Sequence, residues 1–100
     1  MTKLAIYYQQ PKDKDGFEQY YFTQHAPLAQ KVPNIKDTKV RKVIQTQQTE
    51  LKLYLIVELE FADLETLQQT MATPEWQAVM QDAKQLLPYL NEPPFTVITE

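Results

Sequence analysis

The one histidine of this 100-residue chain, His25, is the side chain best suited to acid–base chemistry. An imidazole titrates near neutral pH, so it can take up and release protons during a reaction. A second interpretation stays open, in which His25 hydrogen-bonds the backbone of a helix disturbed by Pro27, two residues further on. Binding of a metal ion would need two or three more ligands, and the chain has no second histidine and no cysteine. We therefore expect no metal site.

Aromatic side chains are concentrated in segments that could surround the same space as His25. They are Tyr7, Tyr8, Tyr20, Tyr21, Phe22 and Tyr54. As core residues they need no further role, but each buried tyrosine hydroxyl still has to find a hydrogen-bond partner. We expect a pocket beside His25 that would suit a small apolar or aromatic ligand. The predicted lining of this substrate pocket is Tyr7, Tyr21, Phe22 and Tyr54.

The composition argues against several other kinds of site. Without cysteine there is no disulfide, no thiolate metal site and no cysteine nucleophile. A single glycine excludes a glycine-rich phosphate loop, and a net charge of −3 argues against a nucleic-acid partner. No apolar run approaches the ~20 residues of a membrane helix. We expect a cytoplasmic protein with no membrane partner and no tightly bound cofactor.

The spacing of hydrophobic residues changes along the chain and predicts six elements. Alternation indicates strands over residues 3–10, 36–48 and 51–61, and a short last strand begins at Phe95. Helical spacing indicates one helix over 16–32, capped by Asp15, and helical structure over 63–87, capped by Asp63. A second helix start signal within the latter segment is the run Thr73-Pro74-Glu75. His25 lies at the border of the apolar stripe of the first helix, and Pro27 predicts a kink or break there. Residues 47–49 are expected to form the turn of a hairpin.

The order β-α-β-β-α-β predicts a ferredoxin-like α+β fold, in which both helices cover one face of a four-stranded antiparallel sheet. We expect one such domain over residues 1–100. The face under the helices is expected to carry Leu51, Leu53, Leu55, Val57 and Leu59. The opposite face is then expected to expose Ala5, Tyr7, Tyr54 and Ile56, an apolar patch of the kind that marks an interface. Two copies placed sheet to sheet would bury the patch and form a homodimeric barrel with a cavity. The alternative is a monomer with one solvated sheet face.

The first predicted helix resembles the EthD family, which is named for the degradation of ethyl tert-butyl ether and belongs to the dimeric α+β barrel superfamily. The resemblance rests on Phe17, Tyr20, Tyr21, the run His25-Ala26-Pro27-Leu28 and the exit Pro33-Asn34. Asn34 stands where the family usually has glycine. The resemblance implies a dimeric α+β barrel, a part in oxidative degradation and a place for His25 beside the pocket.

Two functions from different classes follow from these observations. The first is a small homodimeric enzyme of oxidative or degradative metabolism. It would be an oxidoreductase of monooxygenase type, or a lyase-like enzyme without a tightly bound cofactor, and His25 would be its acid, base or orienting residue. The second is a non-catalytic dimer that binds a small molecule or assists an oxygenase system. Turnover of a ligand that is lost when His25 is replaced would favour the first.

Overall fold

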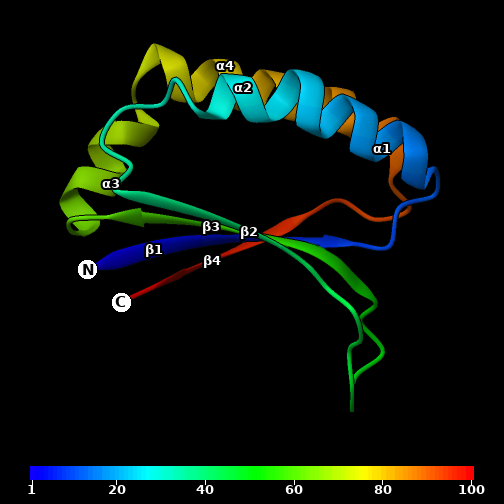
Figure 1. The fold of residues 1–100 in the computed structure, drawn as a ribbon. Helices are drawn as coiled ribbons and strands as arrows, with labels where there is room; N and C mark the ends of the chain where they lie inside the picture. The colour runs from blue at the N-terminus through cyan, green and yellow to red at the C-terminus, as the bar shows by residue number, and fades with distance from the viewer.

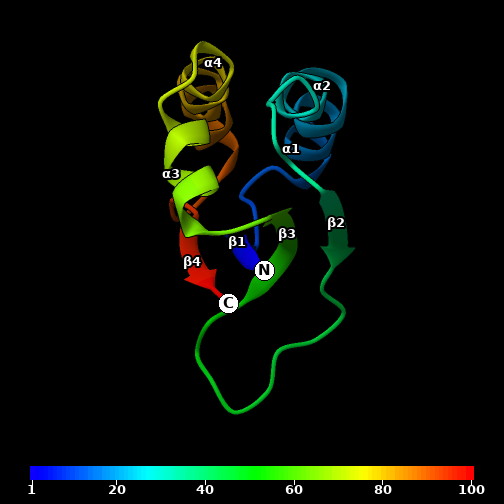
Figure 2. The same ribbon diagram turned by 90° about the vertical axis from the view of Figure 1, so that its left-hand side faces the viewer.

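All helices lie on one face of a four-stranded antiparallel sheet in the computed structural model of residues 1–100 (Figure 1). The strands are β1 (Thr2–Gln9), β2 (Asp37–Lys42), β3 (Leu53–Phe61) and β4 (Phe95–Thr99), in the sheet order β2-β3-β1-β4. The helices are α1 (Lys14–Tyr20), a π-helical turn (Tyr21–His25), α2 (Ala26–Ala29), α3 (Leu64–Met71), α4 (Pro74–Ala83) and a 3₁₀ helix (Lys84–Tyr89). Figure 2 shows α1 and α2 above the β2 side of the sheet, and α3 and α4 above the β4 side. The predicted ferredoxin-like α+β fold is confirmed.

The two central strands hold the core because their side chains alternate in register. Leu4 pairs with Leu59 and Tyr8 with Leu55, and all four side chains are buried under the helices. The residues of the core are Leu4, Tyr8, Phe17, Tyr21, Val32, Tyr54, Leu55, Val57, Leu59, Phe61, Leu67, Trp76, Val79, Leu86 and Leu90. Burial of these side chains is the main force that holds the helix layer to the sheet.

Tyr54 corrects the predicted facing of β3. The pairing of β1 with β3 shifts register beside Tyr8, where Gln9 is opposite Leu53 and Tyr54 is skipped. Such a shift inserts one residue and turns the side chains beyond it to the other face. Tyr54 therefore packs against Phe17 of α1 on the helix side, rather than on the opposite face. Leu51, which was also expected under the helices, lies before the strand and is exposed.

The first helix begins and bends differently from the prediction. Its N-cap is Asp13, not Asp15, and the Asp13 carboxylate accepts the Gly16 backbone N–H at 3.0 Å. Ahead of Pro27 the helix widens into the π-helical turn, where the Ala26 N–H bonds to the Tyr21 carbonyl five residues back. A proline ring collides with the carbonyl four residues earlier in a regular α-helix, and a wider turn relieves that collision.

The second helical segment follows its capping signals. Asp63 caps α3 by accepting the Thr66 N–H at 2.7 Å, as predicted. The Thr73 hydroxyl caps α4 by accepting the Trp76 N–H at 3.2 Å, with Pro74 in the first turn. The Thr73 cap divides the segment into α3 and α4, as its start signal predicts, and this allows α4 to lie alongside α2 (Figure 1).

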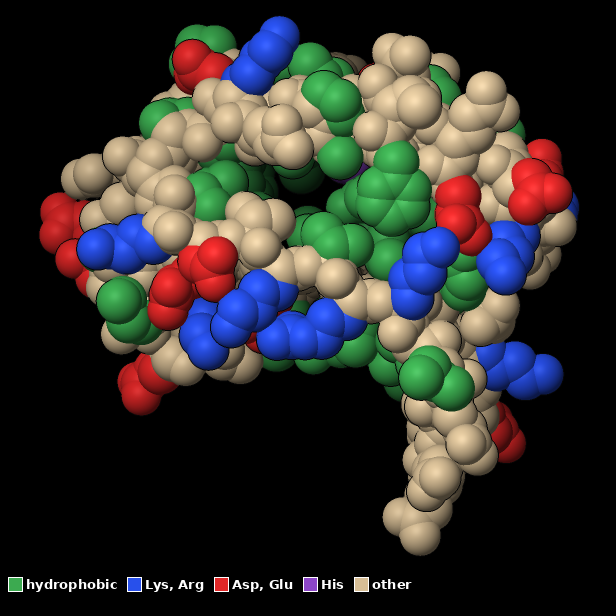
Figure 3. Space-filling view, in the orientation of Figure 1, with side chains coloured by type: hydrophobic (Ala, Val, Ile, Leu, Met, Phe, Trp, Pro, Cys, Tyr) green, Lys and Arg blue, Asp and Glu red, His purple; other side chains and the backbone are tan.

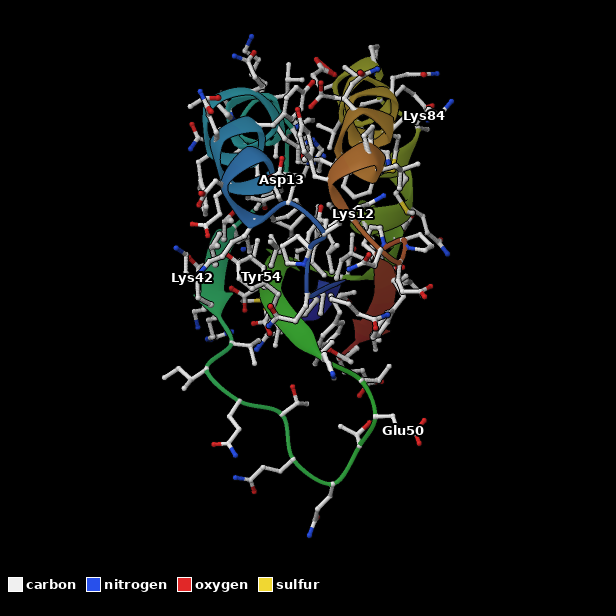
Figure 4. All side chains as sticks on the ribbon, turned by 90° about the vertical axis from the view of Figure 1, so that its right-hand side faces the viewer. Lys12, Asp13, Lys42, Glu50, Tyr54 and Lys84 are labelled. Atoms are coloured by element: carbon white, nitrogen blue, oxygen red, sulfur yellow. The ribbon has the colours of Figure 1, made fainter.

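The connection between β2 and β3 is longer than the predicted turn. Strand β2 ends at Lys42, whereas the strand was predicted to continue to residue 48. Residues 43–52 form a loop that projects away from the helix layer. Glu50 lies near the tip of this loop in Figure 4. Gln48 has a left-handed backbone (φ 58°), and Ile44 is fully exposed.

Candidate functional site

His25 belongs to a chain of hydrogen bonds that joins α4 to the first helical segment. Its Nδ1 lies 2.9 Å from Asp82 Oδ2, and the Tyr20 hydroxyl donates to Asp82 Oδ1 at 2.6 Å. The side chains of His25 and Asp82 are only 6% and 15% exposed. The bond from Tyr20 is the main reason that the pKa of this tyrosine is raised, because it stabilises the neutral phenol beside a carboxylate.

The Asp82 contact determines which nitrogen of His25 carries the proton. An ionised carboxylate only accepts hydrogen bonds, so Nδ1 of a neutral His25 must be the N–H that donates to it. Nε2 is then left with a free lone pair. This is the arrangement in which a carboxylate orients an imidazole that acts as a base through its other nitrogen.

The π-helical turn brings His25 into the protein interior. A π turn contains about one residue more than an α turn, so the residues after it are rotated back by about 100°. His25, at the end of this turn, moves from the border of the apolar stripe to its centre and is 5% exposed. Its ring lies 5.4 Å from that of Tyr21, at the start of the same turn. The side chains at both ends of the turn therefore point toward the sheet.

A cavity of about 370 Å³ lies between the helix layer and the sheet, and His25 is part of its wall. Its other lining residues are Leu4, Ile6, Tyr8, Tyr21, Ala26, Ala29, Gln30, Val32, Ile35, Thr38, Val40, Val57, Leu59, Met71, Trp76, Val79, Met80, Ala83, Pro94 and Thr96. Thr38 and Val40 face the helices from β2 yet remain exposed, so the cavity opens beside this edge strand. Figure 3 shows the molecule hollowed between the two layers.

The structure brings two of the five predicted site residues together at this cavity, His25 and Tyr21. The other three lie elsewhere. Tyr7 is on the sheet face away from the helices, where its ring stacks on Phe95 at 5.1 Å. Phe22 is 42% exposed and touches Tyr21 edge-on. Tyr54 is buried beneath α1.

Three residues of the arrangement, Tyr8, Tyr20 and Asp82, were missing from the predicted site. Asp82 had a detectable signal, because it lies three residues after Val79 and therefore next to the buried face of α4. An acidic residue at the edge of an apolar stripe needs a partner, and His25 was the obvious candidate. Tyr8 and Tyr20 could not be told apart from ordinary core aromatics by sequence.

A second polar cluster joins α1 to β2 and β3. It consists of Glu18, Lys42 and Tyr54. The Glu18 carboxylate accepts hydrogen bonds from Lys42 Nζ at 2.8 Å and from the Tyr54 hydroxyl. Lys42 and Tyr54 lie next to each other in Figure 4. The Lys42 bond, followed by the Tyr54 bond, holds the pKa of Glu18 below its ordinary value. Burial and the Glu18 contact raise the pKa of Tyr54.

Two further features of the chain bear on its partners. None of its helices combines the length and the apolar character that crossing a membrane requires. No three histidine, aspartate or glutamate side chains are gathered in a way that could hold a metal ion.

Comparison with known proteins places the sequence and the fold in one group. The family model of the EthD domain matches residues 9–87. An EthD family protein of Bacillus halodurans has a similar crystal structure, with 38% identity and a TM-score of 0.86 over 100% of this chain and 97% of that one.

Two other similarities are weaker in sequence. An uncharacterised 11.0 kDa protein from the thcB–thcC intergenic region of Rhodococcus erythropolis is 28% identical over 82 residues, 82% of this chain and 80% of that protein. A dimeric ferredoxin-like protein of unknown function from Jannaschia sp. CCS1 shares the fold, with 13% identity and a TM-score of 0.66 over 100% of this chain and 99% of that one. Since the family model covers most of the chain, including the run from Phe17 to Asn34, this protein belongs to the EthD family.

Proposed function

We propose that the protein is an enzyme that moves a proton on a small, largely apolar ligand, with His25 as the general base and no tightly bound cofactor. One observation carries the proposal: Asp82 holds Nδ1 of His25 at 2.9 Å while the ring forms part of the wall of an apolar cavity.

The surroundings of His25 suit proton transfer. A ligand that fills the apolar cavity displaces water from beside the base, so the proton taken from the ligand is not exchanged at once with solvent. Asp82 stabilises the imidazolium that forms and keeps the ring from turning. A role in oxidative degradation, which the family resemblance implies, is compatible with such a step and is part of the proposal.

The base can be tested with 5-nitrobenzisoxazole, a small flat molecule whose isoxazole ring is opened by a base alone. Removal of its ring C–H proton forms a nitrile as the N–O bond breaks, and a coloured phenolate is released. We expect His25→Gln to lower the protein-catalysed rate at least ~100-fold, the usual size of a general-base contribution. Tyr7→Phe, on the far sheet face, is the matched control and should keep the wild-type rate. Equal rates for wild type and His25→Gln would overturn the proposal.

The tautomer of His25 gives a test that needs no ligand. Because the chain has one histidine, its imidazole ¹⁵N signals are unambiguous. We expect the Nδ1–H form of the neutral ring in the wild type. The Nε2–H form would show that Asp82 does not orient the ring as proposed.

A binding protein without catalysis is the second candidate function, favoured by the predominantly apolar cavity lining. In this case the protein would store or deliver an apolar metabolite, for example to an oxygenase system. Trp76, the one tryptophan, lines the cavity and reports its occupancy by fluorescence. Saturable quenching by 5-nitrobenzisoxazole without turnover would favour this candidate.

We also propose that two copies associate through the sheet faces that the helices leave open. This face carries the stacked pair Tyr7 and Phe95, together with Ile56 and Val97. Glu58 accepts ion-pair contacts from Lys3 and Arg41 at its border, at 3.7 and 4.0 Å. Apolar side chains framed by charges are typical of an interface core and rim. The dimeric relative from Jannaschia supports the proposal.

Sedimentation tests this association. A stable interface buries about 1,600 Å² or more in total. We expect the wild type to sediment as a dimer at micromolar concentration and Val97→Arg to sediment as a folded monomer. A wild-type monomer at that concentration would contradict the proposed dimer.

A further inference from the structure

Two buried tyrosines at the cavity have hydroxyl groups that nothing in the chain satisfies. Tyr8 and Tyr21 are only 3% and 4% exposed, yet their hydroxyls make no hydrogen bond, in contrast to those of Tyr20 and Tyr54. Every side-chain nitrogen or oxygen that is fully shielded has a partner. These two hydroxyls therefore touch open space, and the space that both residues line is the cavity.

The two tyrosines are neighbours of each other and of His25. The rings of Tyr8 and Tyr21 lie 5.7 Å apart, edge to face, and the ring of Tyr21 lies 5.4 Å from that of His25. They come from different elements, because Tyr8 is near the end of β1 and Tyr21 starts the π-helical turn. The fold thus gathers three polar side chains without a full set of partners in one apolar cavity. Buried polar groups are normally satisfied, so a ligand is the natural partner.

Both hydroxyls are donors at neutral pH. Burial raises the pKa of Tyr21 to about 12, and burial next to Tyr21 raises that of Tyr8 as well. The cavity lining contains no lysine, arginine, aspartate or glutamate. Neutral donors without a cation suit a carbonyl or phenol oxygen, whereas a carboxylate or phosphate would lack a counter-charge.

We propose that Tyr8 and Tyr21 bind one oxygen of the ligand by two hydrogen bonds, and that the ligand is a small, otherwise apolar carbonyl compound with a C–H next to the carbonyl. This inference rests on the proposed role of His25 for the reaction, but the binding of the oxygen does not depend on it.

The step is balanced without a co-reactant. His25 Nε2 takes the proton from the carbon next to the carbonyl, the C–H electron pair becomes a C=C bond, and the carbonyl π pair moves to the oxygen. The two phenol O–H groups stabilise the enolate oxygen. The imidazolium then returns the proton to the same carbon, or to another carbon of the conjugated system, which exchanges or shifts a hydrogen. The chemistry belongs to enolisation and isomerisation.

Equilibrium binding tests the two donors directly. The probes are p-nitrophenol, below its own pKa, and p-nitrotoluene, which has a methyl group in place of the hydroxyl. Quenching of Trp76 measures both affinities. We expect the wild type to prefer p-nitrophenol, and Tyr8→Phe and Tyr21→Phe each to weaken its binding about 10-fold, the size of one hydrogen bond to an acceptor. The affinity for p-nitrotoluene should be unchanged, and Tyr7→Phe, the neighbour on β1, should change neither.

Each other outcome overturns the donor role. A wild type without preference for the phenol has no paired donors, and equal losses for both probes mean that the rings only shape the cavity. A large loss of stability in Tyr8→Phe or Tyr21→Phe would mean that the hydroxyl has a structural partner. The base is tested separately: if His25→Gln keeps the rate with 5-nitrobenzisoxazole while the phenol preference persists, the proposed function fails and the oxygen site stands. If the rate falls in His25→Gln and the wild type has no preference for the phenol, the oxygen site fails and the proposed function stands.

Discussion

Two carboxylates of this chain, Asp82 and Glu18, have the same kinds of partner in very different surroundings. Each accepts a hydrogen bond from a tyrosine hydroxyl and contacts one nitrogen of a basic side chain. Asp82 binds Tyr20 and His25, whereas Glu18 binds Tyr54 and Lys42. The two clusters differ in the exposure of the basic side chain. The side chain of His25 is 6% exposed beside a cavity, and that of Lys42 is 59% exposed.

The types of residue in a cluster therefore do not by themselves define a reactive site. Lys42 reaches Glu18 from solvent and does not line the cavity, so it links β2 to α1 and has no ligand there to act on. An imidazole that is held by a carboxylate and faces an apolar space is available for proton transfer. Burial and a place for a ligand distinguish the two clusters, and both depend on the fold.

Replacement of each carboxylate by its amide should affect the rate with 5-nitrobenzisoxazole very differently. In Asp82→Asn the new amide can donate to Nδ1, which favours the Nε2–H tautomer of His25, and that form is not a base at the cavity. We expect the rate with 5-nitrobenzisoxazole to fall about 100-fold or more. Glu18→Gln, the matched change in the other cluster, should leave the rate within a factor of two, measured under the same conditions.

Equal losses in Asp82→Asn and Glu18→Gln would end the distinction between a reactive and a structural cluster. The ¹⁵N signals of His25 in the Asp82→Asn protein would then show whether the ring had turned. An unchanged Nδ1–H form together with an unchanged rate would mean that Asp82 has no part in orienting the base.

The next largest effect concerns stability. Asp82→Ala leaves Nδ1 of His25 and the Tyr20 hydroxyl without their acceptor in a largely buried place. We expect a loss of about 1–3 kcal/mol in the free energy of unfolding, measured by urea titration. Glu18→Ala removes contacts in a more exposed cluster, where ion pairs contribute little, so its midpoint should move less. A larger loss in Glu18→Ala would show that the exposed cluster is the more important one for the fold.

The sequence predicted the architecture because the hydrophobic period is constant within most elements and changes from one element to the next. Alternation in the first strand placed Tyr7 on the face away from the helices, and the register of the sheet confirms this. The Asp63 cap followed from local chemistry in the same way. The β-α-β-β-α-β order of elements followed from the sequence of periods along the chain.

The details of the site could not be predicted, because single-residue insertions change which face of a strand or helix the following side chains occupy. One lies in β3, where the skipped Tyr54 turns to the helix side, and the other is the π-helical turn, which rotates His25 inward. Hydrophobic spacing indicates the facing of a side chain only while no residue is inserted, and each insertion turns the side chains beyond it to another face. Asp82 is 57 residues from His25, and only the packing of α4 against the first helical segment brings them together.

The pH dependence of stability gives a smaller difference between the two clusters. The bonds from Lys42 and Tyr54 hold the pKa of Glu18 below its ordinary value in the folded protein. The folded state therefore favours the ionised carboxylate more than the unfolded state does. The stabilisation is fully present above the unfolded pKa, about 4.3, and is lost as the pH falls through the folded pKa.

Thermal unfolding of wild type and Glu18→Gln across this range measures that contribution. We expect the wild type to have the higher Tm at neutral pH and the difference to disappear in acid. Asp63, whose pKa is also lowered by its bonds to Thr66, loses its own contribution over the same range. Subtraction of the two curves removes this shared loss, because Asp63 is present in both proteins. Salt at about 1 M should shrink the difference at neutral pH, since charges are then screened within about 3 Å. A Tm difference that persists unchanged into acid would show that Glu18 acts through packing, and the two carboxylate clusters would differ in more than their exposure.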